Sequence, residues 1–204
     1  LNNFDEGLKK ERELFKECHD SNESSSLIHM FFSERQALKI PDISKEVAVM
    51  SINSAAVIGC GTMGGGIAMN FANSGIPVIV IENSQESLNK GLKIIEKNYS
   101  STVSKGKITE DELMKRMSLI KGTTNIDKIS NADMVIEAVF EEMHLKKDMF
   151  KRIDNLAKEN CILATNTSTL DIDEIANSTN RPEYVIGTHF FSPANVMKLL
   201  EVVR

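Results

Sequence analysis

Five of the eleven glycines lie in residues 59–66, and their spacing is typical of a backbone turn that could bind phosphates. They follow an apolar run, 56–58, that is typical of a buried strand, and they precede a stretch with helical periodicity. In the motif Gly59-Cys60-Gly61-Thr62-Met63-Gly64, the first glycine permits a tight turn, the second lets the backbone approach a pyrophosphate, and the third lets helix and strand pack closely. The N–H groups that begin the helix would hold the phosphates. The pattern predicts a dinucleotide-binding turn.

An acidic residue ends the second apolar run, 78–81, at Glu82, which lies 18 residues after Gly64. A carboxylate at this place accepts hydrogen bonds from the hydroxyls of the adenosine ribose and repels a 2′-phosphate, so we expect NAD rather than NADP. Two alternatives stay open at this point. The cofactor could be FAD, or the glycines could form a simple turn beside a solvated glutamate that binds no ligand.

A histidine and a glutamate near the end of the chain could form a general base. Residues 190–193 indicate a turn after His189, and an apolar run with one acid, Glu201, follows it. If the chain folds back near residue 195, His189 and Glu201 become cross-strand neighbours with Cβ atoms about 5 Å apart. The glutamate would orient the imidazole, which would take the proton of an alcohol that is being oxidised. A histidine at a strand end beside an ion-pairing glutamate, without a catalytic role, is an equally good interpretation.

Three more polar residues follow other predicted strands. Ser168 comes after the run 162–164 and could hydrogen-bond the reacting oxygen. Glu141 and Lys146 begin a predicted helix after 134–139, and their spacing of five places them on different parts of its first turns. From the residues alone, a solvated helix start is the favoured interpretation of this pair.

Predicted strands and helices alternate along the chain from residue 55 onward. Short β-branched runs predict strands at 55–58, 78–81, 119–120, 134–136, 162–164 and 185–186. Helical stretches lie between them at 63–73, 84–104, 110–116, 142–158 and 171–176. This alternation predicts an α/β fold with a doubly wound, mostly parallel sheet of the Rossmann type.

The first part of the chain has a different pattern. Residues 1–40 are predicted to be helical, with a serine-rich break at 21–26 and an end at Pro41, and 41–54 form a polar connection. We therefore expect a helical linker arm over residues 1–50, docked on a neighbouring domain, and a nucleotide-binding domain over 51–204.

The composition of the chain limits the kinds of molecule that it could bind. The 204 residues carry 24 Lys and Arg against 29 Asp and Glu, a net charge of −5 that does not favour nucleic acid. The apolar runs are shorter than the ~20 residues of a membrane span. Cysteines at 18, 60 and 161 and histidines at 19, 29, 144 and 189 form no metal-ligand pattern, so we expect no metal site. Cys60 fits a small residue in a tight loop rather than a nucleophile.

Together these motifs resemble the L-3-hydroxyacyl-CoA dehydrogenase family over about residues 52–204. The resemblance is carried by Val57-Ile58-Gly59-Cys60-Gly61-Thr62-Met63-Gly64, Met134-Val135-Ile136-Glu137-Ala138-Val139, Asn166-Thr167-Ser168-Thr169-Leu170 and Gly187-Thr188-His189-Phe190-Phe191-Ser192-Pro193. The arm resembles the linker helix of peroxisomal multifunctional enzymes of type 1, at Glu11-Arg12, Leu14-Phe15, Ile28-His29, Phe31-Phe32 and Glu34-Arg35.

The resemblance implies a role for each matching residue. His189 and Glu201 fall on the catalytic pair of the family, and Ser168 falls on its contact to the substrate oxygen and cofactor. Glu82 falls on the ribose-binding acid, and Glu141 and Lys146 fall on contacts beside the nicotinamide. The NAD-binding set then comprises Gly59, Gly61, Thr62, Met63, Gly64, Glu82, Ala138, Glu141, Lys146 and Asn166.

The resemblance also implies a reaction, which is oxidation of (S)-3-hydroxyacyl-CoA to 3-oxoacyl-CoA by NAD in fatty-acid β-oxidation. Its partners would be an upstream hydratase/isomerase domain and a downstream helical domain of the full-length chain, and its location the peroxisome, or alternatively mitochondria or cytoplasm. The helical C-terminal domain of the family is absent, so we expect these residues alone to bind NAD but to turn over poorly. The alternatives are a non-catalytic NAD-binding or structural protein, and a Rossmann dehydrogenase for another hydroxy substrate.

Overall fold

The computed structural model of the chain describes residues 3–44 and 46–204. The chain forms two compact units, Leu1–Met50 and Ser51–Arg204. Leu1 and Asn2 of the predicted helical arm and Lys45 of the predicted connection lie outside the described residues.

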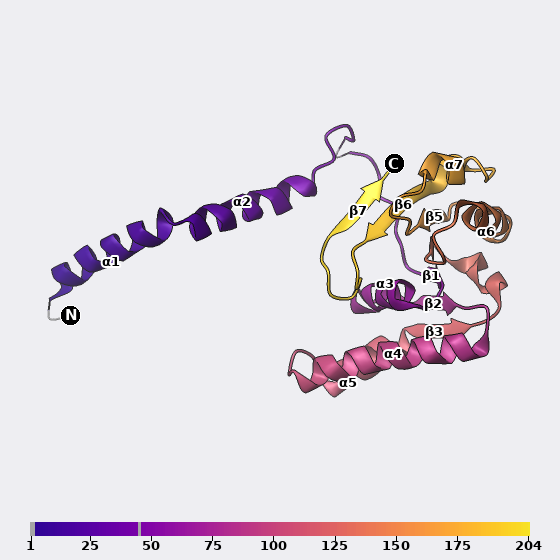
Figure 1. Cartoon of the computed structure of the whole chain (residues 1–204), viewed down its shortest axis with the longest axis horizontal. Helices are drawn as coiled ribbons and strands as arrows, with labels where there is room; N and C mark the ends of the chain where they lie inside the picture. The colour runs from indigo at the N-terminus through magenta and orange to yellow at the C-terminus, as the bar shows by residue number, and fades with distance from the viewer. Residues whose placement is uncertain (1–2, 45) are drawn as a thin grey trace. The chain divides into compact units, whose positions relative to one another are not determined.

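The first unit consists of two consecutive helices, α1 (Phe4–His19) and α2 (Asn22–Ala37) (Figure 1). The predicted serine-rich break is wrong for most of its length, because Ser21 caps α2 by accepting a hydrogen bond from the Ser24 N–H at 3.1 Å. The serines that follow are thus the first turns of a helix. None of the residues of α1 and α2, all of which the structure describes, is buried.

The second unit is built on one sheet, and within the described residues this sheet has seven strands in the order β3-β2-β1-β4-β5-β6-β7. The first six strands are parallel and the last is antiparallel to β6. The strands are β1 (Ala55–Ile58), β2 (Val78–Ile81), β3 (Ile120–Thr123), β4 (Met134–Glu137), β5 (Ile162–Thr165), β6 (Val185–Phe190) and β7 (Leu200–Val203). The order 3-2-1-4-5-6 is that of a doubly wound dinucleotide-binding sheet, so the predicted Rossmann-type fold is confirmed.

Helices cover both faces of this sheet (Figure 1). One core joins the sheet to α3 (Thr62–Asn73), α4 (Gln85–Ser104) and α5 (Glu110–Ser118). The other joins it to α6 (Met143–Leu156), α7 (Ile172–Ala176) and a 3₁₀ turn at Ile126–Asn131; a second such turn, Pro182–Tyr184, precedes β6. Alternate side chains of β1 enter the two cores, as expected for a strand covered on both sides.

Four predicted strands end later than expected. The runs 134–136 and 162–164 are each longer by one residue, at Glu137 and Thr165. The larger differences are that the run 119–120 gives a strand at Ile120–Thr123 and that the run 185–186 continues to Phe190. The residues added to these two strands are not both β-branched and apolar. They are part of the sheet because a neighbouring strand pairs with them, β2 with β3 and β7 with the end of β6. Thr109 and Glu112 form a capping box at the start of α5.

Among the residues that the structure describes, no helix has the length and apolar character needed to cross a membrane. In the same residues, no group of three or more His, Cys, Asp or Glu side chains is placed to hold a metal ion.

Candidate functional site

The glycine turn joins β1 to α3 and packs against β4. Gly59 has a φ of +101°, and a Cβ there would lie 2.6 Å from the Ala138 carbonyl oxygen. A Cβ on Gly64 would lie 2.0 Å from the Gly59 carbonyl oxygen, so this glycine lets helix and strand approach. By contrast, a Cβ on Gly61 would meet no atom within 4 Å, and Gly61 precedes α3 without a side-chain cap. The turn therefore leaves open space at the helix N-terminus, which fits a pyrophosphate.

This difference predicts different effects for two alanine substitutions. Gly61→Ala should leave the melting temperature of the free protein unchanged but lower NAD affinity at least about tenfold, because its methyl group fills the space for the phosphates. Gly64→Ala should lower the melting temperature, since the Cβ collides with backbone. Thermal unfolding and NAD titration measure both effects. Equal loss of stability in the two variants would contradict this assignment of the glycines.

Glu82 lies at the end of β2, beside this turn. Its Oε1 accepts a hydrogen bond from the Cys60 N–H at 2.8 Å, and its Oε2 accepts one from the Asn83 N–H at 3.1 Å. The carboxylate is thus fixed next to the phosphate-binding backbone. Burial raises the pKa of the Cys60 thiol to about 11, and the charge of Glu82 adds to this. Such a thiol is protonated at neutral pH, in agreement with Cys60 as a small loop residue rather than a nucleophile.

An ion-pair network lies at the ends of β4 and β5, where solvated residues were expected. Lys146 is 1% exposed, and its Nζ lies 2.8 and 2.9 Å from the two carboxylate oxygens of Glu137 and 3.3 Å from Oε2 of Glu141. The prediction of a solvated helix start is therefore wrong for Lys146. The predicted position of Glu141 in a helix is wrong too, because α6 begins at Met143, with Glu142 as its N-cap.

Glu141 connects this network to the loop after β5. Its Oε1 accepts hydrogen bonds from Thr167 Oγ1 at 2.6 Å, from the Ser168 N–H at 2.8 Å and from Ser168 Oγ at 3.3 Å. Burial raises the pKa of Glu141, but the hydrogen bonds from Thr167 and Ser168 and the Lys146 charge outweigh it and lower the pKa to about 2. Glu141 is thus a carboxylate at every working pH, and it holds Ser168 in place.

His189 and Glu201 face each other across the antiparallel pair β6 and β7. The register pairs the two residues directly, which is the arrangement expected from a fold-back near residue 195. His189 Nδ1 lies 2.7 Å from Glu201 Oε2, and the imidazole packs at 4.7 Å, centroid to centroid, on the ring of Phe191. The His189 side chain is 26% exposed, so it can be reached from solvent.

The turn between β6 and β7 rests on the same helix that begins at the glycine motif. Asn70 of α3 donates a hydrogen bond from Nδ2 to the Ala194 carbonyl oxygen at 2.9 Å, and a Cβ on Gly66 would lie 3.0 Å from the Ala194 Cβ. Asn166 ties the end of β5 to the end of β6, because its Oδ1 accepts the Phe190 N–H at 3.0 Å. The hairpin that carries His189 is therefore fixed to the nucleotide-binding core.

The remaining predicted contacts lie at the same edge of the sheet. Thr62 and Met63 form the first turn of α3, and Ala138 directly follows β4. All predicted positions except Lys146, in α6, and Glu201, in β7, thus lie on or just after the carboxyl ends of parallel strands, the edge at which open α/β sheets bind ligands. Glu137, Thr165 and Thr167 are further polar residues at this edge, and no role was predicted for them from the sequence. The signal for Glu137 was an acid inside the apolar run 134–139.

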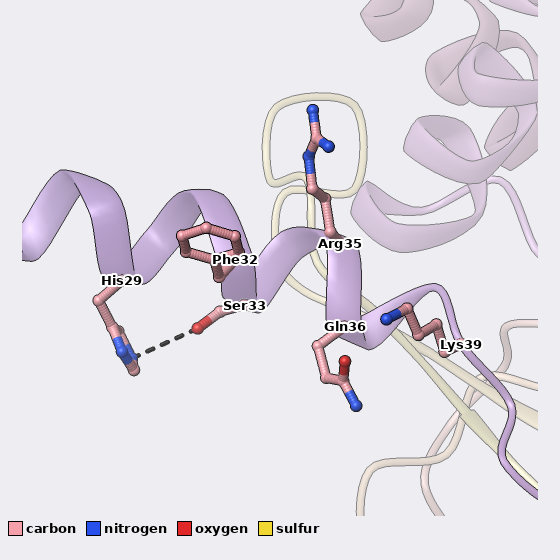
Figure 2. Close-up of a pocket in the computed structure, with 6 residues that line it drawn as sticks. All are labelled: His29, Phe32, Ser33, Arg35, Gln36 and Lys39. Atoms are coloured by element: carbon pink, nitrogen blue, oxygen red, sulfur yellow. Dashed lines mark hydrogen bonds between the residues drawn. The ribbon is translucent and has the colours of Figure 1, made fainter.

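A hollow on α2, in the first unit, is drawn in Figure 2. A hydrogen bond of 3.3 Å joins Ser33 Oγ to His29 Nε2, while Arg35 points away from both. The hollow is lined by His29, Phe32, Ser33, Arg35, Gln36 and Lys39. Because one helix and the residues after it supply the whole lining, nothing encloses a ligand there, and we place the candidate site at the sheet edge.

Comparison with known proteins gives a family match for the second unit. Residues 54–204 match the family described as 3-hydroxyacyl-CoA dehydrogenase, NAD binding domain, which supports NAD as the cofactor. The peroxisomal fatty acid beta-oxidation multifunctional protein AIM1 of Arabidopsis thaliana is 44% identical over 199 residues, which are 97% of this chain and 28% of that protein. The human peroxisomal bifunctional enzyme is 42% identical over 204 residues, which are 98% of this chain and 28% of that protein.

Among solved structures, 3-hydroxybutyryl-CoA dehydrogenase from Escherichia coli K12 is similar, with a TM-score of 0.73 and 38% sequence identity. The similarity covers 75% of this chain and 32% of that chain. The chain thus spans 28% of the length of the two multifunctional relatives that it matches along almost all of its own length.

Proposed function

Because the chain belongs to the 3-hydroxyacyl-CoA dehydrogenase family through its NAD-binding domain, we propose that it is the cofactor-binding part of an enzyme that oxidises (S)-3-hydroxyacyl-CoA to 3-oxoacyl-CoA. The observation that carries this proposal is the 2.7 Å contact between His189 Nδ1 and Glu201 Oε2. It lies on a hairpin that is fixed to the helix of the glycine turn.

The pair acts as a general base. Glu201 binds Nδ1 and thereby leaves Nε2 to take the proton of the C3 hydroxyl, and its charge stabilises the imidazolium that results. Ser168 hydrogen-bonds the substrate oxygen as charge develops on it. The chemistry that bound NAD would supply is acceptance of the hydride that leaves C3. Its phosphates would be held by Gly59, Gly61, Thr62, Met63 and Gly64, and its nicotinamide half by Ala138, Glu141, Lys146 and Asn166.

Glu82 selects the cofactor by charge. The isosteric change Glu82→Gln keeps an oxygen that can accept the Cys60 N–H but removes the negative charge that repels a 2′-phosphate. We expect the ratio of NADP to NAD affinity to rise roughly tenfold, which titration of both cofactors measures. Glu86→Gln, in the first turn of α4, is the matched control. If the ratio did not move, Glu82 would not contact the ribose.

The function is tested on the whole protein with acetoacetyl-CoA and NADH. We expect NADH to be oxidised in proportion to enzyme and acetoacetyl-CoA. NAD binding without any oxidation would favour a non-catalytic NAD-binding protein. Turnover of an alcohol that carries no CoA, with none of acetoacetyl-CoA, would favour a dehydrogenase for another hydroxy substrate. The presence of Ser168, His189 and Glu201 favours the first of these results, oxidation of NADH with acetoacetyl-CoA.

We further propose that the arm, residues 1–50, links an upstream hydratase/isomerase domain to the dehydrogenase part, and that a downstream helical domain completes the acyl-CoA site. The names of the relatives support both this organisation and a peroxisomal location, because they are called multifunctional or bifunctional and peroxisomal. Large apolar side chains exposed on α1 and α2, such as Phe15 and Phe32, supply the surface for docking. A fluorescent fusion of the whole protein that stayed outside peroxisomes would contradict the location.

A further inference from the structure

Glu137 is a fully buried carboxylate for which the proposed reaction has no use. It ends β4 and is 0% exposed. Its Oε1 receives the Val139 N–H at 2.7 Å and Lys146 Nζ at 2.8 Å, and its Oε2 receives Thr165 Oγ1 at 2.7 Å and the same Nζ at 2.9 Å. Each of these contacts uses a carboxylate oxygen as acceptor, which is the role of an ionised carboxylate.

Glu137, Lys146 and Glu141 form a trio with an unbalanced charge. Two carboxylates share one ammonium, so the net charge is −1. Within residues 3–44 and 46–204, Lys146 is the one cationic side chain that forms an ion pair with either carboxylate. Two members of the trio are shielded from solvent, with side chains 0% and 1% exposed, so water screens this charge less than it screens a surface charge.

The trio lies on the side of the sheet where the second nucleotide of a bound dinucleotide belongs. In a doubly wound sheet the dinucleotide crosses the switch point, one nucleotide on each half. Glu82, directly after β2, assigns the adenosine to one half, so the nicotinamide falls on the half of β4, β5 and β6. Glu141 also contacts Ser168, which the proposed function places at the substrate oxygen. The oxidised nicotinamide ring carries a positive charge, whereas the reduced ring is neutral.

We propose that Glu137 sets the relative affinity of the domain for oxidised and reduced cofactor, because its charge makes the trio net negative beside the nicotinamide. The proposal rests on the proposed function, since it needs NAD at this edge of the sheet. The negative trio attracts the positively charged ring of NAD⁺ and not the neutral ring of NADH. It therefore favours binding of NAD⁺ before the substrate is oxidised and release of NADH afterwards. Glu137 is a positioning and electrostatic residue and not a catalytic one, because Lys146 separates it from the site.

A purely structural role makes a different prediction. If Glu137 only anchored Lys146, its loss would weaken both cofactors by the same factor, and the ratio of the two dissociation constants would stay constant. An electrostatic role moves that ratio with the net charge of the trio. Three variants set this charge: Glu137→Gln brings it to 0, Lys146→Met brings it to −2, and the double variant returns it to −1.

The test measures dissociation constants of NAD⁺ by calorimetry and of NADH by its fluorescence, on the full chain at low salt. For Glu137→Gln we expect the ratio Kd(NAD⁺)/Kd(NADH) to rise about three- to tenfold, as one charge at short range requires. Lys146→Met should lower the ratio, and the double variant should return it close to that of the wild type. Lys147→Met, which removes an exposed positive charge one residue along α6, should leave it unchanged.

Each outcome decides between the two roles. A constant ratio across the variants would overturn the electrostatic role, as would a double variant whose ratio did not return. If Glu137→Gln did not fold, Lys146→Met would still test the sign of the effect, in the opposite direction. A wild-type chain that bound neither cofactor would contradict the proposed function itself, and this inference would fall with it.

Discussion

Replacing His189 with alanine is expected to lower the rate of acetoacetyl-CoA reduction by about 10²–10⁴-fold, the usual contribution of a general acid or base. In the direction of reduction, the imidazolium gives its proton to the C3 oxygen, and the alanine variant has no group that can do so. The loss should appear in kcat, while NADH affinity stays close to that of the wild type, because His189 belongs to the hairpin and not to the cofactor turn.

Two further variants separate chemistry from structure. His144→Ala removes a histidine whose side chain is 83% exposed on α6, so we expect normal turnover. Glu201→Gln keeps the shape of the partner but loses its charge, so it should give a smaller loss than His189→Ala. Normal turnover by His189→Ala, measured in the whole protein beside these controls, would exclude the general-base mechanism.

Lys146→Met is expected to have the largest effect on stability, about 3–5 kcal/mol, which is typical when one partner of a buried ion pair is removed. The variant leaves Glu137, which is 0% exposed, and the neighbouring Glu141 as two carboxylates without their shared ammonium. Urea unfolding at pH 7 measures the difference in the free energy of unfolding. Lys147→Met serves as the control and should change that free energy by less than about 0.5 kcal/mol, because its ion pair with Glu174 is exposed.

The stability difference between the wild type and Lys146→Met should depend on pH. In the wild type the pKa of Glu141 is lowered to about 2, so its ionisation stabilises the fold above pH 4.5, and this stabilisation is lost as the pH falls from 4.5 towards 2. In Lys146→Met the pKa of Glu141 is closer to its ordinary value, so the variant loses less over that range. The stability difference between the two proteins should therefore shrink below pH 4.5. A difference that grew on acidification would contradict the ion-pair account.

Local patterns were enough to predict the glycine turn. The three glycines and Glu82 are defined by two strands and the turn and helix between them, and the physical demands on each act over a few residues. The pairing of His189 with Glu201 could also be predicted, because a tight turn fixes which residues face each other on both sides of it. In both cases the information lies close together in the sequence.

The trio could not be predicted in the same way. Its members come from the end of β4, from a loop and from inside α6, and the hydroxyls that complete it come from β5 and the loop after it. The spacing of Glu141 and Lys146 was misleading because it assumed that both residues lie in one helix. The side chain of Glu142 instead caps α6 by accepting hydrogen bonds from the His144 and Leu145 N–H groups, and this excludes Glu141 from the helix.

The order of the residues was enough to predict the fold class, the glycine turn, an acid directly after the second strand and the histidine–glutamate pair. The burial of Lys146, its pairing with Glu137 and the contact of Glu141 with the Ser168 loop emerged from the folded chain. Burial and charge pairing of this kind depend on which strands lie side by side. β4 and β5 are neighbours in the sheet, yet their paired residues lie 28 positions apart in the chain, as with Glu137 and Thr165.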